Sequence, residues 1–270
     1  MIFFIFFILL ISFFLLISRK WEINPRISIP WSFLMTIFGL IILFYLDKSF
    51  PDLKILIKFV ISFFIPLLLS FLTTAYLFFR DPERNSPRKE NVVLSPADGR
   101  IIYIKEIKNG DFPIAIKGKH KIPLSEFTGE DFLSGRGIQI GIAMTFVHVH
   151  VNRSPINGEI VRIKRIPGHF NSLKHLNSLL ENERVFTQIN SEKFKLGVVQ
   201  IASRLVRRIE SYKKVNEKVL IGERIGIIKF GSQVDLIIND PNIKIVANFC
   251  CDLYSVELTI NDGYAMVFMS

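Results

Sequence analysis

Three side chains that could act as a nucleophile, a base and an orienting carboxylate lie in separate, turn-rich segments of the chain. Ser232 follows Gly231 between two apolar runs, His150 lies in a valine-rich run, and Asp98 precedes Gly99 in a turn. A base that activates a hydroxyl, and a carboxylate that orients the base, form a triad that is defined by geometry and not by chain order. These residues are therefore a candidate Asp-His-Ser set.

The Gly231-Ser232 pair has two interpretations. It suits a tight turn, because glycine adopts positive φ cheaply and serine hydrogen-bonds to its own backbone. It also suits self-cleavage, in which the serine hydroxyl attacks the glycine carbonyl in an N-to-O acyl shift. β-Elimination of the resulting ester and hydrolysis of the dehydroalanine would leave a pyruvoyl group at position 232. The local sequence leaves both interpretations open.

Two histidines, His148 and His150, would share a face if residues 146–151 form a strand, because side chains at i and i+2 point the same way. A metal site would need a third ligand, and the other histidines, at positions 120, 169 and 175, lack ligand spacing. We therefore expect no metal and interpret His148 as a structural residue. The adjacent Cys250 and Cys251 are interpreted as small apolar strand residues.

The first 79 residues hold most of the apolar excess of this 270-residue chain, which is 50% hydrophobic and contains 26 Phe. Apolar runs at 1–18, 31–46 and 59–79 predict two to three transmembrane helices, since a span needs about 20 residues. The middle run is short and could instead be one arm of a re-entrant hairpin. Basic residues at 80, 84, 88 and 89 follow the third run. By the positive-inside rule, the following domain is cytoplasmic, at the cell (inner) membrane.

The net charge of +10 suits an anionic membrane surface or an acidic substrate. Nucleic acid is not an expected partner, because there is no long basic run with interleaved aromatics and no zinc-finger spacing. Because of its apolar runs, the segment of residues 1–79 is expected to be a membrane anchor.

Residues 80–270 change to short alternating runs separated by Gly, Pro, Asp and Asn, a pattern typical of β-rich domains. One amphipathic helix is expected at 173–184. The expected fold is a mainly β (α+β) catalytic domain, with a lipoyl-like β-sandwich element near 214–231. Strands are expected at 92–94, 100–104, 114–116, 138–142, 146–151, 198–209, 219–220, 225–230, 234–238 and 243–247.

An ordered set of motifs in this chain resembles the phosphatidylserine decarboxylase family, particularly its short membrane-anchored members. The motifs are Phe-Arg-Asp-Pro-Glu-Arg at 79–84, Ser-Pro-Ala-Asp-Gly at 95–99, Val-His-Val-Asn-Arg at 149–153 with Pro155 and Gly158, Pro167-Gly168 with 181–184, 199–202 with 207–209, and 230–235. They cover somewhat more than half of the chain.

The resemblance implies that Asp98, His150 and Ser232 are a self-processing triad. Cleavage between 231 and 232 would give a β chain (1–231) and an α chain (232–270) that begins with a pyruvoyl cofactor. This group would form a Schiff base with phosphatidylserine and act as the electron sink for loss of CO2, which yields phosphatidylethanolamine. Arg153 is a candidate for the substrate phosphate. The tail, 239–270, matches the family pattern poorly.

Other functions remain open at this point. Archaetidylserine, an ether lipid, would undergo the same chemistry. A membrane-tethered lipoyl-like binding module would use Gly231-Ser232 as an ordinary turn and have no catalysis. A serine hydrolase is disfavoured because the G-x-S-x-G motif is absent around Ser232.

Overall fold

The structure, a computed structural model, describes residues 2–20, 23, 25–84, 92–114, 122–133, 135–145, 147–173, 175, 177–192, 195–203, 208–229, 232–239, 257–259 and 265–267. The chain divides into two compact units. The first comprises Met1–Arg80 with Thr145–Val147, and the second comprises Asp81–Met144 with His148–Ser270.

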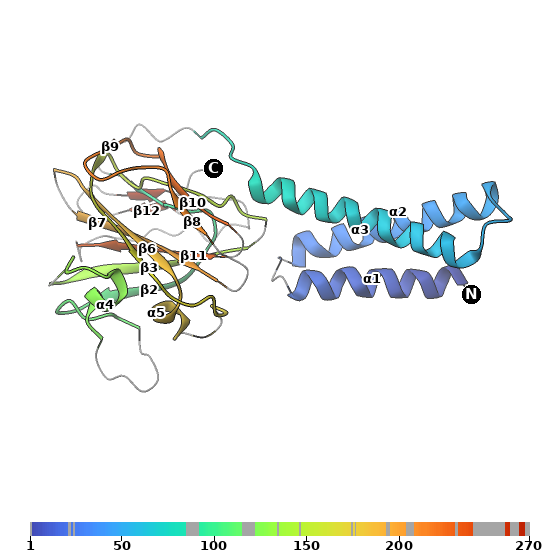
Figure 1. Cartoon of the computed structure of the whole chain (residues 1–270), viewed down its shortest axis with the longest axis horizontal. Helices are drawn as coiled ribbons and strands as arrows, with labels where there is room; N and C mark the ends of the chain where they lie inside the picture. Colours follow the sequence, from blue (N-terminus) through green and yellow to red (C-terminus); the bar gives the residue numbers. More distant parts are fainter. Residues whose placement is uncertain are drawn as a thin grey trace. The chain divides into compact units, whose positions relative to one another are not determined.

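Three helices, each long and apolar enough to cross a membrane, make up most of the first unit: α1 (Ile2–Lys20), α2 (Pro25–Ser49) and α3 (Ile55–Phe79) (Figure 1). The predicted apolar helices are thus confirmed, and the described residues contain three of them. The helix is longer than the apolar run 31–46: α2 continues through Pro30 and is 25 residues long, and whether it spans or forms a re-entrant arm remains a prediction. Neighbouring helices allow proline inside membrane helices, because they satisfy the freed backbone groups.

A small residue lets these helices approach closely. A Cβ on Gly39 in α2 would lie 2.6 Å from Leu10 Cδ2 and 2.9 Å from the Ser62 carbonyl oxygen of α3. Only glycine fits such a contact without displacement, as is common between membrane helices. Lys58 of α3, which is buried, also donates to Asp47 of α2 at 2.9 Å.

The second unit is built around a seven-stranded antiparallel sheet in the order β2-β3-β11-β7-β6-β5-β9. Strand β11 lies inside this sheet, and all seven of its residues pair with β3 on one side and β7 on the other. The strands are β2 (Arg100–Ile107), β3 (Gly137–Met144), β5 (Gly158–Ile166), β6 (Arg184–Asn190), β7 (Lys195–Ala202), β9 (Lys218–Val219) and β11 (Ser232–Ile238).

Two three-stranded sheets accompany it. One is antiparallel, in the order β4-β10-β8, and contains β4 (Val151–Arg153), β8 (Ile209–Ser211) and β10 (Arg224–Ile228). The other has the order β1-β13-β12, with β1 (Val92–Leu94) parallel to β13 (Ala265–Val267) and β12 (Glu257–Thr259) antiparallel to it.

Both faces of the large sheet are covered. One core joins Val234 and Leu236 of β11 to Ile209 and Ile228 of the β4-β10-β8 sheet. The other core includes Ile237 of β11 and apolar residues of the short helices α4 (Leu124–Thr128) and α5 (Ser178–Glu181). Strand β11 thus contributes apolar side chains to both cores, and Gln233 and Asp235 are buried polar residues within it. The mainly β (α+β) domain is confirmed, whereas its lipoyl-like character remains a prediction.

Several expected elements are wrong. The strand expected at 198–209 is not continuous, because β7 ends at Ala202 and β8 begins at Ile209, and Ile114 of the strand expected at 114–116 lies in a bend.

Strand β4 begins only at Val151, so His148 and His150 precede it. The chain turns there, and His150 Nδ1 lies 2.8 Å from the His148 carbonyl oxygen.

The helix expected at 173–184 is reduced to the four residues of α5. Asn182 is extended, and its side chain bonds to the backbone of Asn171 and to the carbonyl of Ala202, which ends the helix. Strands β5 and β6 were not expected. The strand expected at 243–247, and residues 115–116 of the one at 114–116, lie outside the described residues.

Candidate active site

Ser232 is the first residue of β11, and its Cα pairs with Met144 of β3 and Ala202 of β7. Its backbone therefore lies at the end of a central strand of the large sheet. Gly231, on the other side of the expected cleavage site, is outside the described residues. The cleavage site between Gly231 and Ser232 remains a prediction.

Asp98 lies in a tight turn between β1 and β2. Ser95 closes the turn by donating from Oγ to the Ala97 carbonyl oxygen at 2.7 Å. Glycine is needed at position 99, because a Cβ there would lie 2.4 Å from the Ala143 carbonyl oxygen of β3. Since Ala143 directly precedes Met144, the strand partner of Ser232, the turn lies at the same end of the sheet as Ser232.

The carboxylate of Asp98 is buried and paired with Arg84, which lies in the short segment that follows α3. Arg84 donates from Nη1 to Oδ1 and from Nη2 to Oδ2, the second at 2.5 Å. A guanidinium and a carboxylate that meet with two parallel bonds form a strong and directional pair. Sequence reasoning gave Arg84 a role only as interfacial charge, although it occurs in one of the matching motifs.

His150 is fully buried just before β4. Its Nδ1 faces the His148 carbonyl oxygen, which can only accept, so the proton belongs on Nδ1 and the lone pair on Nε2. Burial lowers the pKa of His150 to about 3. The imidazole is therefore neutral near pH 7, which is the form a general base requires.

Backbone contacts bring the segments of all three predicted residues together. The His150 carbonyl accepts from Ile228 N at 3.2 Å, four residues before Ser232. Arg153 N donates to the Pro96 carbonyl at 2.9 Å, which ties the end of β4 to the turn that holds Asp98. The side-chain relay from Asp98 through His150 to Ser232 remains a prediction.

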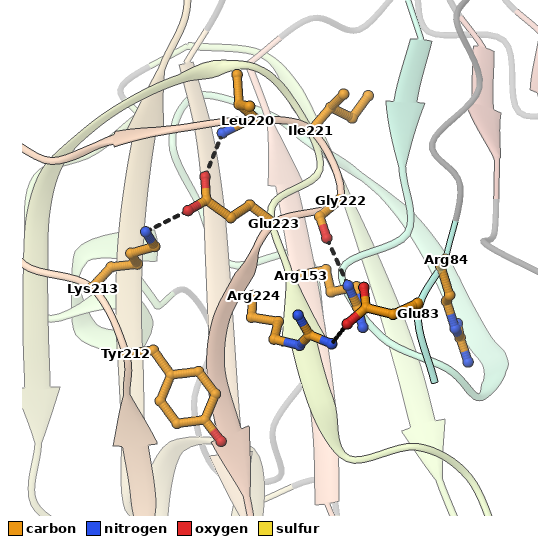
Figure 2. Close-up of a pocket in the computed structure, with 10 residues that line it drawn as sticks. All are labelled: Glu83, Arg84, Arg153, Tyr212, Lys213, Leu220, Ile221, Gly222, Glu223 and Arg224. Atoms are coloured by element: carbon orange, nitrogen blue, oxygen red, sulfur yellow. Dashed lines mark hydrogen bonds and ion pairs between the residues drawn. The ribbon is translucent and has the colours of Figure 1, made fainter. Parts of the chain in front are cut away.

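A polar cavity of about 500 Å³ opens beside the Asp98 turn, between the linker that follows α3 and the segment that leads into β10 (Figure 2). Its charged walls are internally paired: Lys213 donates to Glu223 at 2.5 Å, and Arg224 to Glu83 at 2.6 Å. The residues that line it are Glu83, Arg84, Arg153, Tyr212, Lys213, Leu220, Ile221, Gly222, Glu223 and Arg224.

Arg153, the predicted phosphate ligand, lines this cavity but is buried and bound by protein oxygens. Its Nη1 donates to the Gly222 carbonyl at 3.0 Å, and its Nη2 to Asp81 at 2.6 Å and to the Pro82 carbonyl at 3.0 Å. These contacts give it a structural task, and a contact with phosphate remains a prediction.

The large sheet contains a buried polar cluster that was not predicted from the sequence. Asp235 of β11 accepts from Tyr103 Oη and Gln139 Nε2 at 2.5 Å and from Gln233 Nε2 at 2.7 Å. Burial raises the pKa of Asp235 to about 6 and also raises that of Tyr103. Polar residues at alternating positions 233 and 235 of an otherwise apolar strand were the available signal. Within the described part of the chain, no group of three or more His, Cys, Asp or Glu is placed to hold a metal ion.

The fold and site define a class: three long apolar helices and a mainly β domain, in which a serine opens a central strand and a buried, neutral histidine bonds through its backbone to the preceding strand, β10. Comparison with known proteins identifies the family within this class. The family model for phosphatidylserine decarboxylase matches residues 71–249. The chain belongs to the phosphatidylserine decarboxylase family.

Two curated relatives, from two Chlorobium species, are both named phosphatidylserine decarboxylase proenzyme. The protein of Chlorobium phaeobacteroides is 34% identical over 186 residues, which is 66% of this chain and 78% of the relative. The protein of Chlorobium luteolum is 38% identical over 164 residues, which is 61% of this chain and 68% of the relative. The matched family region contains Asp98, His150, Gly231 and Ser232.

Proposed function

We propose that this protein is a membrane-bound, pyruvoyl-dependent phosphatidylserine decarboxylase that matures by cutting its own chain between Gly231 and Ser232. It would convert phosphatidylserine to phosphatidylethanolamine and CO2. The observation that carries the proposal is the position of Ser232, which opens a central strand where the segments of Asp98 and His150 converge. Membership of the family, and relatives named as proenzymes, support it.

In the maturation step, His150 takes the hydroxyl proton of Ser232 on Nε2, and Oγ attacks the Gly231 carbonyl carbon. The amide C–N bond breaks, the Ser232 nitrogen takes up a proton, and an ester joins the two halves. Loss of the Ser232 α-proton then expels the Gly231 carboxylate and leaves dehydroalanine. Water replaces its nitrogen, which departs as ammonia, and a pyruvoyl end remains. The neutral imidazole of His150 supports its role as the base.

The pyruvoyl group supplies an electrophilic carbonyl and an electron sink for decarboxylation of an amino acid headgroup. The strand neighbours of position 232 are buried, Met144 with 6% and Ala202 with 0% of its surface exposed, so this end of β11 is shielded from water. Shielding suits a reactive carbonyl, because it limits side reactions with solvent. Arg153, with the other basic residues that line the cavity, is the proposed contact for the lipid phosphate.

The proposed mature enzyme consists of a β chain, 1–231, and an α chain, 232–270. Residues 1–79 would hold it in the cell (inner) membrane, and residues 80–270 would form the catalytic domain on the cytoplasmic side. The three apolar helices support membrane association. Carbonate-washed membranes should retain the protein, and protease should digest the domain only in inverted vesicles. Digestion in right-side-out vesicles instead would show that the domain lies on the opposite side of the membrane.

The same chemistry on archaetidylserine is disfavoured, since both relatives are bacterial proteins named after phosphatidylserine. Release of CO2 from diacyl and ether-linked substrates in matched micelles would compare the two directly.

The deciding experiment is the intact mass of the purified full-length protein beside its Ser232→Ala variant. The wild type should give fragments of 1–231 and 232–270, with the smaller one blocked to Edman degradation, and the variant should remain one chain. Ser211→Ala, at the end of β8, is the matched control and should be cleaved like the wild type. A single unmodified wild-type species of 31.2 kDa would overturn the proposal and leave a binding module or a hydrolase.

A further inference from the structure

The segment that connects α3 to the β domain, residues 81–84, is fixed to that domain by ion pairs. Asp81 accepts from Arg153 Nη2 at 2.6 Å and from Arg224 Nε, and Glu83 accepts from Arg224 Nη2 at 2.6 Å. Figure 2 shows Glu83 directed at the Arg224 guanidinium, with the Arg84 side chain apart from this group. We call residues 81–84 the linker segment.

Arg153 connects the linker segment to two other parts of the site. Its guanidinium bonds both to the linker segment, at Asp81 and Pro82, and to the Gly222 carbonyl, while its backbone N donates to Pro96 in the turn that holds Asp98. Only 7% of the Arg153 side chain is exposed. A buried charge that is bound on all these sides holds its neighbours in one arrangement, because losing a partner would leave it uncompensated.

The linker segment ends at Arg84, whose guanidinium meets both oxygens of Asp98. The side chains of Arg84 and Asp98 are only 9% and 8% exposed. The planar guanidinium fork matches a carboxylate in two dimensions, which an ammonium does not. The rotation of the Asp98 carboxylate is therefore set by a residue that comes from the linker segment.

We propose that Arg84 is the positioning residue for Asp98 and that docking of the linker segment delivers it. This inference rests on the proposed function, in which Asp98 assists cleavage at Gly231-Ser232. The Asp98 carboxylate is then held in one orientation at the turn that packs against β3. Self-processing would accordingly require residues 81–84 to be docked.

The test is the rate of self-cleavage of the full-length protein after cell-free synthesis into lipid nanodiscs, followed on denaturing gels. Arg84→Gln should slow cleavage at least tenfold, because it removes both the charge and the fork. Arg84→Lys should restore part of the rate, because it keeps the charge alone. Arg136→Gln is the matched control, because Arg136 is exposed and pairs with Glu106. This variant protein should cleave itself at the wild-type rate. Thermal unfolding of each variant in a Ser232→Ala background reports whether the domain still folds.

The outcomes separate this inference from the proposed function. If the wild type stays uncleaved, the proposed function itself is contradicted. A cleaved wild type with Arg84→Gln at the same rate overturns the role of Arg84, and Arg84→Lys at the wild-type rate overturns positioning by the guanidinium fork. If Arg84→Gln does not fold, Arg84→Lys decides: a folded, slower protein supports positioning by the fork, and the wild-type rate contradicts it.

Discussion

The buried carboxyl of Asp235 and the buried imidazole of His150 respond to acid in opposite directions. The folded-state pKa of His150, about 3, lies below its ordinary value of 6.5. Stability from this residue is therefore lost as the pH falls below 6.5. The folded-state pKa of Asp235, about 6, lies above its ordinary value of 3.8. The stability that Asp235 contributes to the folded state therefore grows as the pH falls from 6 towards 4. The two effects oppose each other over that window.

Replacing Asp235 should therefore expose the acid sensitivity caused by His150. In the uncleaved Ser232→Ala background, Asp235→Asn should lose stability more steeply than its parent between pH 6.5 and 4.5. The difference in stability between the two proteins should change by roughly 2 kcal/mol across this range, since one proton contributes at most about 1.4 kcal/mol per pH unit. Thermal unfolding in detergent across this pH range measures it. Parallel curves for the two proteins would show that Asp235 does not titrate in the window.

The neutral state of His150 also predicts the pH profile of maturation. Cleavage of the wild type should continue at a nearly constant rate from pH 8 to pH 5.5, because burial keeps the imidazole unprotonated. Pulse-chase cleavage at fixed pH values measures this. A rate that halves near pH 6.5 would indicate an ordinary, solvated histidine instead.

At the scale of elements, the turn that carries Asp98 depends on a close approach to β3. Gly99→Ala would place a Cβ 2.4 Å from the Ala143 carbonyl oxygen, which is backbone and cannot move aside cheaply. We expect this variant to cleave itself at least tenfold more slowly, as measured by denaturing gel. Gly135→Ala is the matched control, because nothing lies within 4 Å of a Cβ at that position. Equal rates for the two variants would show that the turn adapts.

Elements with strong periodicity were predictable, and the arrangement of the site was not. The three apolar helices, β3 and β11 follow from local patterns, because length and apolar runs determine them. Strand β5 was missed although apolar residues alternate with Arg and Lys along it, the pattern of a strand with one exposed face, and its pairing with β6 places it in the sheet. The pairing of Arg84 with Asp98 joins residues that are separated by a turn-rich stretch, and only the tertiary fold brings them together. Candidate residues were thus available from the sequence, but their partners were not.

At the scale of the whole molecule, cleavage before Ser232 would leave β11 between two strands of the other chain. All seven residues of β11 pair with both β3 and β7, and Asp235 adds contacts to Tyr103 and Gln139. We expect 232–270 to stay bound to 1–231 through gel filtration in mild detergent. Purification through an N-terminal tag should recover both chains in equal amounts. Loss of the smaller chain during washing would contradict this.

The interior position of β11 has a genetic consequence. A copy disabled by Ser232→Ala and a copy disabled by His150→Ala should not restore growth to a strain that depends on this activity, even when both are expressed together. Each copy would need to exchange its central strand with the other, and two full ladders of backbone hydrogen bonds oppose that exchange. The two alleles would then behave as one complementation group, and every active molecule would descend from a single intact polypeptide.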